Sequence, residues 1–482
     1  MKKGKPVILV IFLLIHFLCC GQNSPEYTEK EADLNSQDSN QLRIELAKQY
    51  LEKGFPEKSD SLARLIYLSG KEKGSSYFLG AFHEISAGVC KEKKEATGMY
   101  EHLTQAANYY KEADSIKKAA ETFEQFATQK SWAGKYAESI ANFKKAKLLY
   151  EKIPGNHQKI AFCYNNIGIN YFTMGDYAKA EEFFHKQRKV YKQNHDSSGI
   201  AQSLNNLGVI SYSRGNHQKA INYYLESLKI REAKGNHIKA ATNYLNIGNI
   251  YKDMEDYHEA MIFYKKALDA YTEIDDSLRM ATCLNNIGIV YERKGAYQKA
   301  LETYKRSARI RKKIKDNIKL AINYINIASV YEELDRFDQA IEYNYKAYEL
   351  MKKINNKKRL AIIHNNLGNL FLQKEKYKIS GDHLQKSLGL SKEIMSKDLL
   401  KRNYKALSKL YENTGKPVKA LDYYKQFTAL KDSIFNETKH EQIVELATKY
   451  ETEKKEQEIE LLKKENQINE LQLKKGKNYR IY

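Results

Sequence analysis

Apolar and polar positions along most of this chain follow the spacing of amphipathic helices, and the whole pattern returns every 40 residues. In nearly every period a small residue follows an apolar one, and in most copies an aromatic residue stands three positions later. In chain order the small residues are Ala47, Ala87, Ala127, Gly168, Gly208, Gly248, Gly288, Ala328, Gly368 and Ser408, with one step of 41 residues. Because ten copies follow in register, the sequence predicts an array of repeats rather than several unrelated domains.

Each copy also contains a second small residue with a bulky residue four positions later, as in Ala260 and Tyr264. A turn separates the two small residues and often places Gly at the end of the first helix, as at Gly175 and Gly295. The whole chain contains only 5 Pro, so helices can run through most of it. We therefore expect one helix pair per copy, with small and large positions that interlock within and between pairs.

The order of an apolar residue, Gly, Tyr, a turn, Ala and an aromatic residue resembles the tetratricopeptide repeat over residues 42–435. The usual unit has about 34 residues, and the longer unit here, with its Asn-Asn-Leu-Gly motif, resembles the kinesin-light-chain type. The resemblance implies an all-α, right-handed superhelical solenoid of about ten helix pairs with a concave groove lined by the first helices. It also implies that the extra residues lengthen the second helix and its following turn.

An asparagine stands two residues before the small residue in six successive copies. These residues are Asn166, Asn206, Asn246, Asn286, Asn326 and Asn366. At about 100° per residue, Asn166 falls nearly opposite the packing positions Tyr164 and Gly168, so we expect the row outside the core. Asn249 and Asn369 stand on the same side.

Two interpretations of this row stay open, and they are compatible. The amides either form a ladder between neighbouring repeats, or they line a groove and bind the main chain of an extended peptide, since a carboxamide both donates and accepts hydrogen bonds. Many peptide-binding members of the resembled family use an asparagine at this position. The eight asparagines are therefore our candidate ligand-binding residues.

The charge balance, 81 Lys and Arg against 60 Asp and Glu, gives a net charge of +21. The lysines are scattered, which favours a solvated helix surface; contact with anionic lipid or an acidic partner is the alternative. No motif for nucleic-acid binding, nucleotide binding, metal binding or nucleophilic catalysis is found in the sequence. We therefore expect a protein that is not an enzyme and has no cofactor, no metal and no nucleic-acid partner. Cys163 and Cys283 share one repeat position, which predicts buried core residues.

Residues 1–20 have the pattern of an export signal, with a lysine-rich start and an apolar run from Val7 to Leu18. The end of this run, Phe17 to Cys20, resembles the lipobox of bacterial lipoproteins, in which the cysteine is lipidated. The resemblance implies a lipid anchor on Cys20; cleavage without lipid is the alternative. The polar segment 21–41 predicts a flexible tether. We therefore expect an exported, periplasmic protein held on a bacterial membrane.

Residues 437–482 predict a long amphipathic helix, because the stretch from Thr448 to Lys475 is rich in Glu and Lys and contains no Pro or Gly. Such a helix allows self-association as a coiled coil, or it caps the last repeat. The segment resembles the linker of tetratricopeptide-repeat membrane sensors, which precedes a histidine-kinase or DNA-binding output domain. The chain is then either a truncated sensor or a stand-alone lipoprotein.

The functional prediction is an exported scaffold that binds proteins or peptides, as the sensory half of an envelope signalling system. The alternative is an adaptor that assembles an envelope protein complex.

Overall fold

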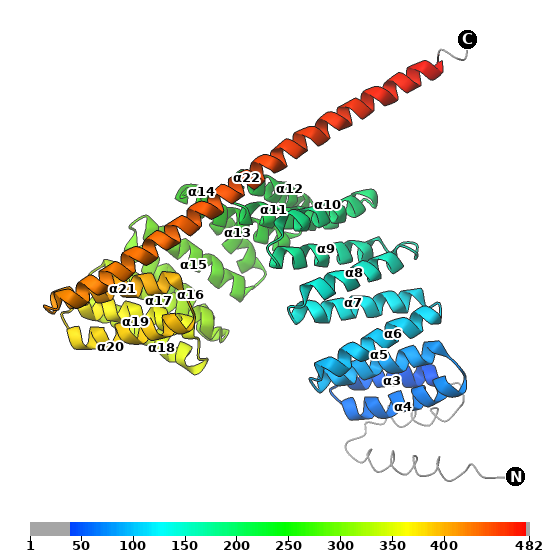
Figure 1. The fold of residues 1–482 in the computed structure, drawn as a ribbon, viewed down its shortest axis with the longest axis horizontal. Coiled ribbons are helices and arrows are strands. Elements are labelled where there is room, and N and C mark those ends of the chain that lie inside the picture. Colours follow the sequence, from blue (N-terminus) through cyan, green and yellow to red (C-terminus); the bar gives the residue numbers. More distant parts are fainter. Residues whose placement is uncertain (1–38, 479–482) are drawn as a thin grey trace, which may run out of the picture. The chain divides into compact units, whose positions relative to one another are not determined.

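The computed structural model describes residues 39–478, which form an all-α chain (Figure 1). Within this range the backbone is helical almost throughout and includes no strand. The predicted signal with Cys20 lies outside the described residues, as does the tether up to residue 38. The fold class is therefore the predicted one for the part of the chain that can be described.

Residues 39–478 contain twenty helices, two for each of the ten copies that the repeat count predicts. They are α3 (Asn40–Glu52), α4 (Pro56–Glu72), α5 (Ser76–Glu92), α6 (Ala96–Glu112), α7 (Ile116–Trp132), α8 (Tyr136–Tyr150), α9 (His157–Thr173), α10 (Tyr177–Gln193), α11 (Ser197–Ser213), α12 (His217–Ala233), α13 (His237–Asp253), α14 (Tyr257–Glu273), α15 (Ser277–Arg293), α16 (Tyr297–Lys313), α17 (Asn317–Glu333), α18 (Phe337–Lys353), α19 (Lys357–Gln373), α20 (Tyr377–Glu393), α21 (Lys397–Asn413) and α22 (Pro417–Asn478).

The 40-residue unit consists of two helices of equal length and two short links. In the pair α13 and α14, both helices have 17 residues, and the middle residue of each three-residue link has a positive φ, 61° at Glu255 and 53° at Asp275. Gly takes this place at Gly295, with φ 69°, because it has no Cβ to strain. The second helix and its following link are therefore no longer than the first helix and its link. Helices of equal length let both partners pack along their full length, about 25 Å at 1.5 Å per residue.

One link departs from this rule. The connection between α8 and α9 spans residues 151–156, twice the usual length. It includes Pro154 and Gly155, and Gly155 has a φ of 78°. Because α8 has only 15 residues, the helix and its longer link together add one residue, which accounts for the single 41-residue step in the repeat.

The predicted interlocking of small and large residues is confirmed by close helix approaches. A Cβ added to Gly248 in α13 would lie 2.7 Å from Cδ1 of Tyr264 in α14, and one added to Gly288 would lie 2.5 Å from Cε1 of Tyr304. Carbon atoms do not approach so closely without repulsion. The glycines therefore leave the space that the aromatic side chains of the second helices occupy.

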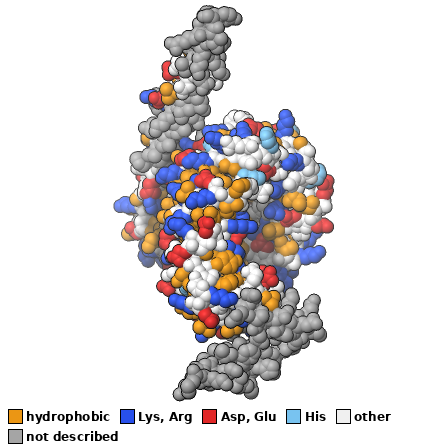
Figure 2. Space-filling model, turned by 90° about the vertical axis from the view of Figure 1, so that its right-hand side faces the viewer, with side chains coloured by type: hydrophobic (Ala, Val, Ile, Leu, Met, Phe, Trp, Pro, Cys, Tyr) orange, Lys and Arg blue, Asp and Glu red, His pale blue; other side chains and the backbone are white. Residues whose placement is uncertain are grey.

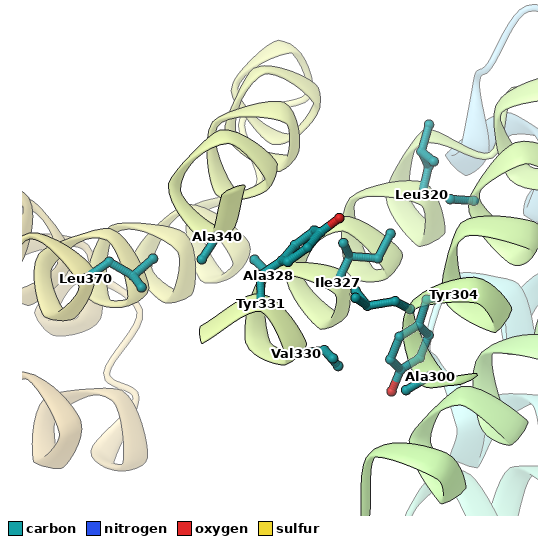
Figure 3. Packing of buried hydrophobic residues seen from close by; sticks show 11 residues of the cluster. Ala300, Tyr304, Leu320, Ile327, Ala328, Val330, Tyr331, Ala340 and Leu370 are labelled. Atoms are coloured by element: carbon teal, nitrogen blue, oxygen red, sulfur yellow. The ribbon is translucent and has the colours of Figure 1, made fainter. Parts of the chain in front are cut away.

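The hydrophobic core continues from one repeat to the next. Figure 3 shows Ile327 and Val330 of α17 beside Tyr304 of α16, with Ala328 and Tyr331 facing the following helices. The first three of these side chains are fully buried. Because each pair covers the apolar face of its neighbour, the array is stabilised by contacts between adjacent repeats.

The chain divides into two compact units, one ending at Ser213 and the next beginning at Arg214. The first unit contains α3 to α11 and the second contains α12 to α22. Within each unit, every helix packs against the next one along the chain, and the first helices α19 and α21 also contact each other.

Helix α22 combines the second helix of the last pair with the predicted C-terminal helix. It runs for 62 residues without a break, so the helix begins at Pro417 and not near residue 437. Its first turns carry Val418, Leu421 and Tyr424 with exposed fractions of 82%, 55% and 53%. No further first helix covers them within residues 39–478, which explains why these apolar side chains face solvent.

Charged side chains of both signs are mixed on the surface. On the face drawn in Figure 2, Lys and Arg side chains lie among Asp and Glu side chains and scattered apolar ones. Many lysines pair with acids one helical turn away, as Lys346 does with Glu342 at 2.6 Å. Such pairs are typical of solvated helix faces.

Candidate functional site

The six asparagines of the predicted row all lie on first helices and are half-buried. Asn166 and Asn206 lie in the first unit, and Asn246, Asn286, Asn326 and Asn366 lie in the second. Each side chain stands beside the packed face of its helix, so it is less exposed than the helical-wheel argument predicts. The row is nevertheless outside the apolar core.

Three of these amides bond the first helix of the preceding repeat. The Nδ2 of Asn206 donates to Oδ1 of Asn165 at 2.8 Å. The same bond joins Asn326 to Asn285 at 3.1 Å. Asn286 instead donates to Asn249, four positions further along the preceding first helix, at 3.0 Å. The amide ladder is therefore present in this part of the row.

The other members do not repeat this bond. Asn166 donates to the main-chain oxygen of Phe162 in its own helix at 2.9 Å. Asn366 donates to Oδ1 of Asn344 on a second helix at 3.5 Å, a weak contact. Asn246 makes no such bond within the described residues. Since the bonds differ between repeats, the ladder does not by itself explain why the row recurs.

The two additional predicted residues are placed differently. Oδ1 of Asn249 accepts from the Tyr264 hydroxyl at 2.8 Å as well as from Asn286. Asn369 bonds Asn365 of its own helix, donating to the main-chain oxygen at 2.9 Å and to Oδ1 at 3.2 Å. Asn249 therefore belongs to the ladder, whereas Asn369 stands outside it. The role of all eight residues in ligand binding stays a prediction.

Sequence reasoning missed the asparagines that accept these bonds and a deeper layer behind them. Asn165 and Asn285 precede the row residues by one position, and the Asn-Asn doublet was the signal that could have identified them. Asn323 is fully buried and donates to Asn285 at 3.3 Å. Similarly, buried Asn403 accepts from Asn365 at 2.9 Å. These buried amides fix the register of adjacent repeats.

A pocket of about 440 Å³ lies between the first helices α19 and α21. Asn365 and Asn369 form one side of this pocket, and the other side is basic, with Arg402, Lys405 and Lys409. Arg402 pairs with Asp398 at 3.0 Å. Glu412 and Tyr424 complete the lining. The three basic residues recur at helical spacing along α21, a signal that the sequence offered.

The chemistry of this pocket suits an anionic or carboxamide-like ligand group. Carboxamides supply donors and acceptors, and the ammonium and guanidinium groups supply further donors with positive charge. Asn369 is the predicted residue that the structure brings to this pocket. The other predicted asparagines lie along the first helices of the preceding repeats.

The cysteines are core residues, as predicted. Cys163 and Cys283 are both fully buried, and burial raises the pKa of each thiol to about 12. Thiols of this kind stay protonated and unreactive near neutral pH. Among residues 39–478 no group of three or more metal-ligating side chains comes together. The same range includes no helix that is both apolar and long enough to cross a membrane.

These features define a helical-repeat scaffold with an amide-rich first-helix face. The family described as Tetratricopeptide repeat matches this sequence over residues 118–193, 166–233, 199–273, 239–313, 279–353 and 319–393. These matches cover more than half of the chain. The chain belongs to the tetratricopeptide repeat family. Among curated proteins, no match to the sequence is found.

Solved structures resemble the chain at low sequence identity. A signal transduction ATPase with numerous domains and a tetratricopeptide repeat sensor, from Pyrococcus horikoshii, has a TM-score of 0.52 and 14% identity, covering 76% of this chain and 55% of that chain. At this identity the likeness shows the fold alone.

Two further structures align at lower TM-scores. BtubC from P. vanneervenii has a TM-score of 0.41 and 21% identity, covering 48% of this chain and 92% of its own. The Rap conjugation gene regulator of plasmid pLS20, in complex with the Phr* peptide, has a TM-score of 0.43 and 18% identity, and the alignment covers 70% of this chain and 96% of that chain. These two likenesses say nothing about function.

Proposed function

We propose that this chain is an exported, non-catalytic scaffold that binds extended peptide segments of other proteins along its first-helix face. The observation that supports the proposal is the asparagine row itself. Each amide has two N–H donors and a carbonyl oxygen with two lone pairs, and the inter-repeat bond of Asn206 or Asn326 uses one donor. The remaining groups are available to the main chain of a peptide.

The pocket between α19 and α21 would determine the orientation in which a peptide binds. Asn369, Lys405 and Lys409 would bind a carboxylate, while Asn286, Asn326 and Asn366 of the same unit would bind main-chain amides. An extended peptide with an acidic side chain or a free C-terminus near one end meets both requirements. Charge-assisted bonds to a carboxylate are stronger than neutral ones, so this pocket would select the acidic group.

Features of the sequence support a place for this activity at a bacterial membrane. The signal-like segment and Cys20 support export and a lipid anchor, and the C-terminal segment resembles the linker of membrane sensors. We propose that the scaffold is the interaction half of an envelope signalling system. In this arrangement α22 would pair with a second copy or with the partner that carries the output domain.

Site-specific photo-crosslinking in the native bacterium tests the proposal. A photoreactive amino acid replaces Ser329, a half-buried residue of α17 three positions after Asn326, and in a matched strain it replaces exposed Glu349 of the second helix α18. We expect one defined protein to be crosslinked from position 329 and not from position 349. Equal crosslinking at both positions, or none at position 329 while a partner still co-purifies, would contradict binding along the first helices.

A further inference from the structure

A second groove lies on another side of the first unit, between the second helices α8 and α10. Two adjoining pockets of about 600 and 490 Å³ form it, and both are lined by Tyr164 and Lys186. The larger pocket is bounded by the long link with Ile153 and Pro154. The equivalent place in the second unit, between α14 and α16, has a three-residue link and contains a smaller pocket of about 450 Å³.

The floor of the groove is aromatic. The Phe183 ring lies 6.0 Å from the Tyr164 ring and 5.6 Å from the Tyr171 ring, measured between centroids. Lys186 Nζ lies 4.7 Å from the Phe183 centroid, and Lys144 Nζ lies 5.9 Å from it on the other helix. Rings that are flanked by ammonium groups offer both apolar contact and positive charge.

Basic groups outnumber acidic ones around this floor. The lining lysines are Lys144, Lys147, Lys179, Lys186 and Lys189, and the lining carboxylates are Glu151 and Glu182. The carboxylates pair with Lys147 at 2.9 Å and with Lys186 at 2.5 Å. Lys144 and Lys189 have no acidic partner within residues 39–478, so the groove keeps a positive charge.

We propose that this groove binds a short acidic peptide segment of a partner protein, with an apolar side chain on the aromatic floor and carboxylates on Lys144, Lys186 and Lys189. The combination of a recessed apolar floor and a basic rim fits alternating apolar and acidic residues. A flat lipid surface could not reach the recessed rings. None of the row asparagines lines the groove, so this site is independent of the proposed first-helix site.

Fluorescence anisotropy with a defined probe tests the site. The probe is a labelled synthetic peptide in which Glu alternates with Tyr and Leu, and the control peptide carries Gln in place of Glu. The pocket variant combines Lys144→Gln with Lys186→Gln. The matched control combines Lys305→Gln with Lys346→Gln, because Lys346 holds the same repeat position, pairs with Glu342 at 2.6 Å and lies 4.4 Å from the Tyr343 ring.

We expect the wild-type chain and the matched control to bind the acidic probe equally, and the pocket variant to bind it at least about tenfold more weakly. Binding should also weaken as salt concentration rises. A pocket variant that stays folded by circular dichroism and binds as tightly as the wild type would overturn the proposal. So would equal binding of the Gln peptide, or displacement of the probe by anionic lipid vesicles. An Asn286→Ala change should leave probe binding unaltered, which separates this site from the first-helix face.

Discussion

At the scale of single residues, Asn286 shows how one amide can serve both stability and binding. Its Nδ2 bonds Oδ1 of Asn249 in the preceding repeat, and that oxygen also accepts from Tyr264. Asn166 occupies the same repeat position but bonds only its own helix. The two residues therefore form a natural comparison, because replacing either by Ala brings the same gain in helix propensity.

We expect Asn286→Ala to be less stable than Asn166→Ala by about 0.5–1.5 kcal/mol, the usual net value of one hydrogen bond. Both proteins should remain folded, since Asn249 keeps its bond from Tyr264. Chemical denaturation of the two variants measures the difference. Equal stabilities would show that the ladder bond contributes nothing and would leave ligand binding as the reason for the row.

Two glycines allow an equally direct test of packing. A Cβ at Gly288 would lie 2.5 Å from the Tyr304 ring, whereas one at Gly389 in α20 would meet no atom within 4 Å. We expect Gly288→Ala to destabilise the protein by about 1–3 kcal/mol through overpacking. Gly389→Ala should stabilise it by about 0.5–1 kcal/mol, because Ala is the better helix former. Thermal melts that shift in the same direction for both variants would refute the close approach at Gly288.

At the scale of helix pairs, the same position can hold different side chains. In α17 and α18, Tyr324 packs against Tyr343 with centroids 5.7 Å apart. The corresponding residues of α19 and α20 are His364 and His383, whose Nδ1 atoms lie 2.9 Å apart. One imidazole donates to the other in this contact, so the pair tolerates at most one proton on the shared nitrogens.

This histidine pair should make stability depend on pH. Burial, followed by the neighbouring His383 and Lys386, lowers the pKa of His364 to about 4, while an unfolded histidine has a pKa of about 6.5. Between these values the unfolded chain binds the proton more readily, so stability is lost as pH falls from about 6.5 to 4. We expect a loss of about 1–2 kcal/mol at pH 5.

The double change His364→Tyr and His383→Tyr copies the neighbouring Tyr324–Tyr343 pair and provides the control. The melting temperature should decrease more between pH 7 and pH 5 for the wild type than for this variant. If both proteins lose the same number of degrees, the pair does not carry the pH dependence.

At the scale of the whole molecule, the proposed lipid anchor can be tested directly. The lipobox-like end of the signal predicts a lipid on Cys20. We expect the wild-type protein in the membrane fraction with the added mass of a lipid, and Cys20→Ala in the soluble fraction. A wild-type protein that is soluble and carries no lipid mass would exclude the anchor.

Helix α22 suggests how two molecules could associate. Between Thr448 and Lys475 the sequence has seven Lys and seven Glu, so two such helices would not repel each other despite the net charge of +21. We expect the full chain to sediment as a dimer and a chain ending at Asn436 to sediment as a folded monomer. Identical sedimentation states would contradict self-association through this helix.

The repeat pattern alone determined the fold class, the number of pairs and the packing partners. The reason is that each helix pair contacts only its neighbours, so the residues that meet in the core lie close together in the sequence. Gly248 and Tyr264, for example, are 16 positions apart and are in contact. Local spacing also located the asparagine row on the first helices. It could not show that these residues are half-buried, because the angle around one helix says nothing of how closely the next repeat approaches.

Tertiary structure decided the contacts that join distant positions. The bond of Asn326 to Asn285 spans 41 residues, and the basic pocket of Arg402, Lys405 and Lys409 exists only where α21 packs on α19. The larger pocket beside Lys186 is bounded by the long link of residues 151–156, which interrupts the periodic pattern. The sequence pattern therefore predicts the features that recur in every repeat. The role of a residue that departs from the repeat depends on the side chains that tertiary packing places around it.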